Sequence, residues 1–198
     1  VHPRLGQDDG KRVLSWDALV IFDEIQTGFY RTGSLFAFQG LGVQPDILTA
    51  AKAMSGGMPM GAILSSDELF QAFRQDPPLN HVTTFGGHPL SAAAAHVTLK
   101  ELLAMDVEEK VAEIWALSES MLKGDGIVEL RGRGAMMGLQ LESGELTQRV
   151  VERCFEAGVV LGWTLHSNSL IRIAPPLIIE LDRLKEAYEV LLGAVAQG

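Results

Sequence analysis

A short apolar run, Ala18–Phe22, constrains the fold of this chain more than any other feature, because it ends directly in the acidic pair Asp23-Glu24. A continuous run of this length is typical of a strand buried on both faces of a parallel α/β sheet. In open α/β sheets, ligands bind beyond the carboxyl ends of the strands. We therefore expect Asp23 to be partly desolvated and to pair with a cation, although a helix cap or a structural ion pair would also suit it.

The composition narrows the class of protein. Of the 198 residues, 47% are apolar and the formal net charge is −9, which argues against binding to nucleic acid phosphates. A single cysteine excludes an intramolecular disulfide and favours a reducing compartment. Residues 1–10 lack a basic-then-apolar leader pattern, and no apolar run approaches a membrane span, so we expect a cytoplasmic protein.

The order of the expected elements predicts two domains. Short strands at Ile47–Ala51 and Ala62–Leu64 lie in an α/β part, and a helix that begins at Pro89 closes this part. Alternating strands and helices then follow a helix from Val107 to Leu122, which suits a small α+β domain. We place the two domains at residues 1–105 and 106–198.

Three further segments carry residues suited to chemistry. Lys52 stands among small apolar residues, where burial would lower the pKa of its amine and make it a nucleophile, although most lysines lie on solvated faces. Thr83–Gly87 precedes a helix and offers hydroxyl and N–H groups to a phosphate, but ordinary capped turns have the same composition. Arg172 lies between apolar strand residues, so we expect it to be buried and paired with a carboxylate of the protein or of a substrate.

In combination, these features resemble the class III pyridoxal-phosphate-dependent aminotransferases. The segments that carry the resemblance keep the family's order and approximate spacing: Asp23–Phe29, Arg31–Gly33, Lys52, Gly56–Gly61, Thr83–Leu90, Arg131–Gly134 and Ile171–Leu177. The resemblance implies the second half of a fold-type I large domain, with a mostly parallel sheet, followed by the small C-terminal domain. It also implies transamination from an amino acid, ω-amino acid or diamine to a 2-oxo acid.

The resemblance assigns roles residue by residue. Lys52 would form the Schiff base with pyridoxal 5'-phosphate and move the proton, and Asp23 would hold the pyridine nitrogen. Gln26 would bind the ring oxygen at the 3' position. Thr84 would bind the phosphate of the neighbouring subunit in a homodimer, and Arg172 would meet a carboxylate. The five histidines show no metal-ligand spacing, so we expect no metal.

Some features depart from the family pattern. Tyr30 replaces a smaller residue and is expected to narrow the substrate entrance, and Gly162–Leu165 is similar to diamine-type members. The chain opens without Met and is about half the family's length, so we expect the 198 residues alone to bind cofactor weakly and to turn over poorly.

Alternatives to transamination stay open at this stage. Aminomutases and decarboxylases use the same landmarks. Asp23-Glu24 also imitates the Walker B strand of an ATPase, although a Gly-x-x-x-x-Gly-Lys-Ser/Thr loop is absent. An inactive scaffold would fit a truncated chain.

Overall fold

The chain forms two compact units, seen in a computed structural model that describes residues 18–74, 81–163 and 167–198. The first unit contains Ser34–Met105 together with the described chain up to Phe29. The second contains Asp106–Gly198 together with the short segment Tyr30–Gly33. This segment therefore belongs to the second unit by its contacts, although both of its chain neighbours belong to the first.

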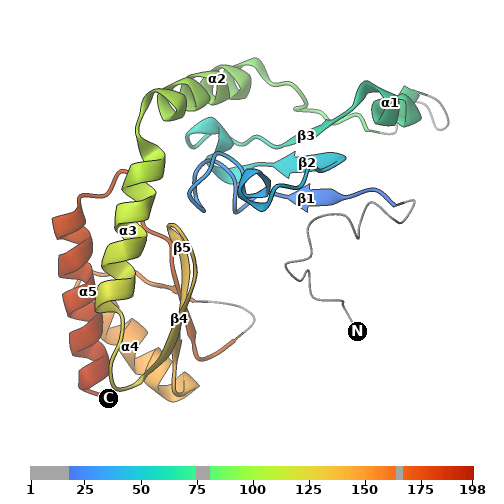
Figure 1. The fold of residues 1–198 in the computed structure, drawn as a ribbon. Helices are drawn as coiled ribbons and strands as arrows, with labels where there is room; N and C mark the ends of the chain where they lie inside the picture. Colours follow the sequence, from blue (N-terminus) through green and yellow to red (C-terminus); the bar gives the residue numbers. More distant parts are fainter. Residues whose placement is uncertain (1–17, 75–80, 164–166) are drawn as a thin grey trace. The chain divides into compact units, whose positions relative to one another are not determined.

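A three-stranded sheet organises the first unit (Figure 1), in the order β1 (Ile21–Asp23), β2 (Ile47–Ala50) and β3 (Ala62–Ser65). Strands β1 and β2 run parallel, with Asp23 opposite Thr49, whereas β2 and β3 are antiparallel. Because the carboxyl ends of parallel strands meet at one edge, the residues that follow β1 and β2 emerge on the same side of the sheet.

Strand β1 differs from its prediction in length and burial. It begins at Ile21, not Ala18, and it includes Asp23 as its last residue. The Ile21 side chain is 61% exposed, so the prediction of a strand buried on both faces is wrong for the described residues. A continuous apolar run indicates that other segments pack on both faces of the strand, but it does not show that these segments belong to the same 198 residues.

The helical elements of the first unit are short, with one exception. They are η2 (Ala37–Leu41), η3 (Lys52–Ser55), α1 (Asp67–Phe70), η4 (Gln71–Arg74) and α2 (Pro89–Ala104). The N-cap of α1 is Ser66, whose hydroxyl accepts a hydrogen bond from Leu69 N at 3.3 Å. Helix α2 begins at Pro89, whose missing N–H costs nothing in the first turn.

The second unit is an α+β arrangement. Its elements are α3 (Val107–Met121), β4 (Ile127–Arg133), β5 (Met136–Leu141), α4 (Gly144–Glu156), β6 (Gly162–Trp163), β7 (Leu170–Ile173) and α5 (Leu181–Ala196). The sheet has the order β4-β5-β7-β6, and all of its pairs are antiparallel. None of the helices in the described ranges is long and apolar enough to cross a membrane.

One face of this second sheet forms the core with the helices, among which α3 and α5 lie side by side (Figure 1). Alternate residues of β5 and β7 are buried, as the period of two in a strand requires, including Leu139 and Ile171 at 0% exposure. Between α3 and α5, the hydroxyls of Ser118 and Tyr188 lie 2.6 Å apart in a buried hydrogen bond. The residues between the buried ones, Arg172 among them, therefore lie on the opposite face.

Candidate active site

Asp23 is held at the carboxyl end of β1 by two donors. Its Oδ1 accepts hydrogen bonds from Ile25 N at 3.0 Å and from Thr49 Oγ1 at 3.2 Å. Its Oδ2 accepts none from the described residues, and the side chain is exposed, so the expectation of a desolvated carboxylate is wrong for this chain. The arrangement fixes the carboxylate through one oxygen and leaves the other available to a ligand.

Lys52 is the first residue of η3, two positions after β2 ends. Its backbone has φ 49°, in the left-handed region, where a non-glycine residue costs about 1–2 kcal/mol. The side chain is exposed and has no hydrogen bond or ion pair with any described residue, which corrects the expectation of a buried amine. Strain of this kind persists at functional sites, where the surrounding structure enforces it.

The loop after Lys52 provides that enforcement. Ser55 is fully buried, and its hydroxyl donates to the carbonyl oxygen of Met58. Gly56, at φ 58°, lies directly against α2, because a Cβ at this position would be 2.6 Å from Thr98 Oγ1. The loop is thus clamped internally and against a helix, so it can hold Lys52 in its strained conformation.

Glu24 is a site residue whose role the sequence analysis did not identify. It is 1% exposed, and its carboxylate accepts hydrogen bonds from Ala37 N at 3.1 Å, from Phe38 N at 2.8 Å and from the Thr27 hydroxyl. Through these hydrogen bonds, Glu24 holds the start of η2 next to the end of β1. A carboxylate used in this way is not available as the catalytic base of an ATPase, which argues against the Walker B interpretation.

Gln26 lies in the turn that follows β1, three residues after Asp23. The turn is closed by a hydrogen bond from Gly28 N to Glu24 O at 3.0 Å, and the Gln26 side chain is exposed. Because β1 and β2 are parallel, Asp23, Gln26 and Lys52 all lie at or just beyond the carboxyl ends of these two neighbouring strands. Nowhere in the described ranges do three side chains of the metal-binding types come together.

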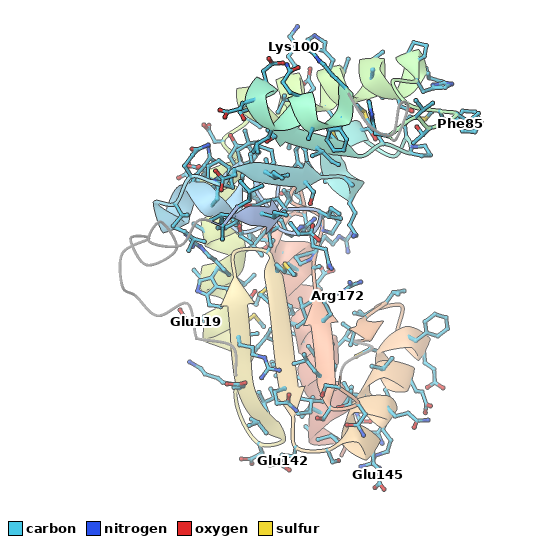
Figure 2. The ribbon with its side chains drawn as sticks, turned by 90° about the vertical axis from the view of Figure 1, so that its right-hand side faces the viewer. Phe85, Lys100, Glu119, Glu142, Glu145 and Arg172 are labelled. Atoms are coloured by element: carbon cyan, nitrogen blue, oxygen red, sulfur yellow. The ribbon has the colours of Figure 1, made fainter. Side chains whose placement is uncertain are left out.

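Thr84 lies in the turn before α2 and lines an open cavity of about 480 Å³. The other wall of this cavity is Pro59–Gly61, the end of the loop that begins at Lys52. The neighbouring Phe85 is 78% exposed and its ring points outward (Figure 2). The Thr84 segment is thus an exposed surface of the first unit that presents hydroxyl and backbone N–H groups.

Arg172 belongs to the second unit, on the exposed face of β7 (Figure 2). Its strand neighbours are Gly138 on β5 and Gly162 on β6, and a Cβ at Gly162 would lie 3.1 Å from Arg172 Nε. The guanidinium therefore rests where β6 carries no side chain, beside a cavity of about 410 Å³. It makes no hydrogen bond or ion pair with any described residue, so the expected protein partner is not observed in these ranges.

Comparison with known proteins shows a consistent pattern. Residues 14–195 match the family model described as aminotransferase class-III. The chain is 40% identical over 180 residues to the acetylornithine aminotransferase of Methanothermobacter thermautotrophicus, covering 88% of this chain and 44% of that protein. It is 39% identical over 188 residues to the putrescine aminotransferase of Pectobacterium atrosepticum, covering 88% and 39%. The chain thus spans less than half the length of these relatives.

Solved structures agree. An omega-transaminase from Thermomicrobium roseum superposes with a TM-score of 0.85 at 30% identity, over 95% of this chain and 45% of that one. Ornithine delta-aminotransferase from Plasmodium falciparum gives 0.83 at 28%, over 94% and 49%. These likenesses confirm the predicted fold class, a fold-type I α/β protein, and the members of this family depend on pyridoxal phosphate.

Proposed function

Because the chain belongs to the class III aminotransferases, we propose that it is the lysine-bearing half of an enzyme that transfers an amino group from an amino acid, ω-amino acid or diamine to a 2-oxo acid. The observation that carries this proposal is the edge where β1 and β2 end in parallel. There neither the second carboxylate oxygen of Asp23 nor the amine of Lys52 has a partner among the residues that the structure describes, and the Lys52 backbone is strained.

The residues at this edge fit pyridoxal 5'-phosphate. When bound, the cofactor supplies an electron sink for the bond that breaks at the substrate carbon. Asp23 Oδ2 accepts no hydrogen bond within the described ranges and can hold the protonated pyridine nitrogen, while Thr49 and Ile25 N fix the direction of the carboxylate. Gln26 can donate from its amide to the ring oxygen. Lys52 Nζ would hold the cofactor covalently, and its amine could take and return the proton at the substrate carbon.

We also propose a homodimer in which Thr84 reaches the cofactor phosphate of the partner subunit. The proposal is supported by the exposed position of the Thr84 turn and by the exposed ring of Phe85 beside it. Large exposed aromatic side chains are common where another protein surface covers them. A cytoplasmic location is proposed on the single cysteine of the sequence.

Arg172 is the residue that we propose for a substrate carboxylate. A guanidinium binds a carboxylate in a bidentate manner, and this one has no partner in the described part of the chain. Relatives are named for acetylornithine and ornithine, which carry a carboxylate, and for putrescine, which does not, so both classes of donor belong in the test. Thr164 and Leu165 of the diamine-type segment lie outside the described residues.

The direct test uses the full-length protein that contains this chain. Borohydride reduction, followed by mass spectrometry of the peptide around residue 52, should show a stable cofactor adduct on the wild type and none on Lys52→Ala. Lys100→Ala is the matched control, because Lys100 is an exposed lysine of α2 in the same unit (Figure 2). An adduct that survives in Lys52→Ala would refute the assignment.

The reaction type is tested separately. Putrescine, ornithine, β-alanine and 4-aminobutyrate are offered as donors, with 2-oxoglutarate or pyruvate as acceptors. Transfer of nitrogen to the 2-oxo acid supports an aminotransferase, whereas release of carbon dioxide or an isomerised amino acid without transfer would favour a decarboxylase or an aminomutase.

A further inference from the structure

The pairing of β5 with β7 stops where a proline interrupts it. In this antiparallel pair, Met137 lies opposite Ile173. Continuing the same register outward by two residues places Ala135 opposite Pro175. Pro175 and its successor Pro176 have no backbone N–H, so neither can donate a hydrogen bond to β5. The chain just beyond β7 therefore lacks the N–H donor at position 175 that would extend the pairing.

Arg31 supplies a donor at this position. Its Nη1 donates to Pro175 O at 2.6 Å and to Ala135 O at 3.3 Å, and its own carbonyl oxygen accepts from Ala135 N at 3.0 Å. The guanidinium thus bridges the two carbonyls that face each other where the backbone ladder ends. Gly134, at φ 58°, allows this approach, since a Cβ there would lie 3.0 Å from Arg31 O.

The guanidinium of Arg31 directs its hydrogen bonds to these two carbonyl oxygens and not to a carboxylate of the described residues. The side chain is half-buried, and no carboxylate in the described ranges pairs with it. Hydrogen bonds from a charged donor to carbonyl oxygens are stronger than those between neutral groups, particularly away from bulk water. A cation placed in this way contributes to holding two strand ends together rather than to surface solvation.

We propose that Arg31 is a positioning residue for Arg172. Its side chain replaces the backbone hydrogen bond that Pro175 cannot donate to β5. Pro175 lies three residues after Arg172, so fixing its carbonyl fixes the end of the short strand that presents the guanidinium. The assignment of a carboxylate to Arg172 rests on the proposed function, whereas the hydrogen bonding of Arg31 to the carbonyls of Pro175 and Ala135 does not.

The first arm of the test reads the strand ends directly. In the full-length protein, Arg31→Met should speed amide hydrogen exchange in the peptides that cover Met136–Leu141 and Leu170–Ile173 by about tenfold, the loss expected for one charge-assisted hydrogen bond. Arg31→Lys should restore part of the protection. Arg133→Met is the matched control, because Arg133 is exposed on β4 and has no described partner. Unchanged exchange in Arg31→Met would overturn the proposal.

The second arm reads the effect on Arg172. Arg31→Met should raise KM for 4-aminobutyrate by about tenfold while kcat changes little, and KM for putrescine, which has no carboxylate, should stay near the wild-type value. Arg172→Met calibrates the assay. If Arg172→Met raises this KM and Arg31→Met does not, the positioning role is wrong. If neither variant raises KM for 4-aminobutyrate, Arg172 does not bind the carboxylate, and the positioning role of Arg31 is wrong as well. Faster amide exchange in Arg31→Met would then still support the contact between Arg31 and the strand ends.

Discussion

The two adjacent carboxylates at the end of β1 are expected to have different roles. Glu24 should stabilise the local structure, and Asp23 should be needed for activity. Glu24 is 1% exposed and accepts from two backbone amides, those of Ala37 and Phe38, whereas Asp23 is exposed. Glu24→Gln preserves the shape of the side chain but replaces one acceptor oxygen with an NH₂ group that faces a donor. Each amide bond to a charged carboxylate contributes about 1.5–3 kcal/mol, so losing one of them should weaken the local structure by a similar amount.

The magnitude translates directly into amide exchange. Since about 1.4 kcal/mol is a factor of ten, the amides of Ala37 and Phe38 should exchange about ten to a hundred times faster in Glu24→Gln than in the wild type. Hydrogen exchange followed by mass spectrometry of the η2 peptide measures this change in the full-length protein. A local probe is chosen because the change lies in η2, whereas a global unfolding curve reports on both units together.

Asp23→Asn is the matched control, since it removes the neighbouring charge while leaving the η2 amides satisfied. We expect unchanged exchange at Ala37 and Phe38, together with a steep loss of transamination. If Asp23→Asn loosens the η2 amides as much as Glu24→Gln does, or if Glu24→Gln leaves them protected, the division of roles between these two carboxylates is incorrect.

Two further predictions concern backbone strain and alkaline stability. Lys52→Gly should unfold with a free energy about 1 kcal/mol larger than Lys52→Ala, because glycine accepts φ 49° without strain; equal unfolding curves would show that the conformation costs nothing. Burial raises the pKa of the Cys154 thiol above its usual 9.0 and that of the Tyr188 hydroxyl above its usual 10.0, the latter against a smaller lowering by Ser118. Because the folded state holds both protons more tightly, their contribution is complete below about pH 9 and is lost as pH rises through the raised values. Tyr188→Phe should flatten the loss of stability above about pH 10 in urea unfolding, and an unchanged slope would contradict the role of Tyr188.

The sequence predicted the elements better than their exposure. The start of α2 at Pro89 follows from the preference of proline for the first turn, and the apolar run correctly predicted that Asp23 ends a strand. The burial of Asp23 was predicted incorrectly, because burial depends on every segment that packs against a residue. The chain spans 44% of its acetylornithine aminotransferase relative, so an apolar pattern can require cover that these residues do not provide.

Arg172 shows a different kind of error, one that the sequence itself could have corrected. We expected a buried cation because isoleucines flank it, yet side chains of a strand alternate between faces. Ile171 and Ile173 are buried, which places Arg172 on the other face, and its exposure follows from the same three letters. The role of Arg31 was not accessible in this way, because it depends on contacts with residues more than a hundred positions away.

Two of the proposed site residues, Lys52 and Arg172, have no hydrogen-bond or ion-pair partner in the part of the chain that the structure describes, whereas residues near them are held in place. The amine of Lys52 has no partner in the described ranges, but the loop behind it is clamped by buried Ser55. The guanidinium of Arg172 also has no partner among these described residues, while Arg31 donates to the carbonyl oxygen of Pro175 just beyond the end of its strand. A ligand-binding group needs unused hydrogen-bonding capacity and a fixed position at once, and one side chain cannot provide both. If this separation of roles holds, substitutions at the supporting residues Ser55 and Arg31 should weaken substrate or cofactor binding more than they lower the rate of the chemical step.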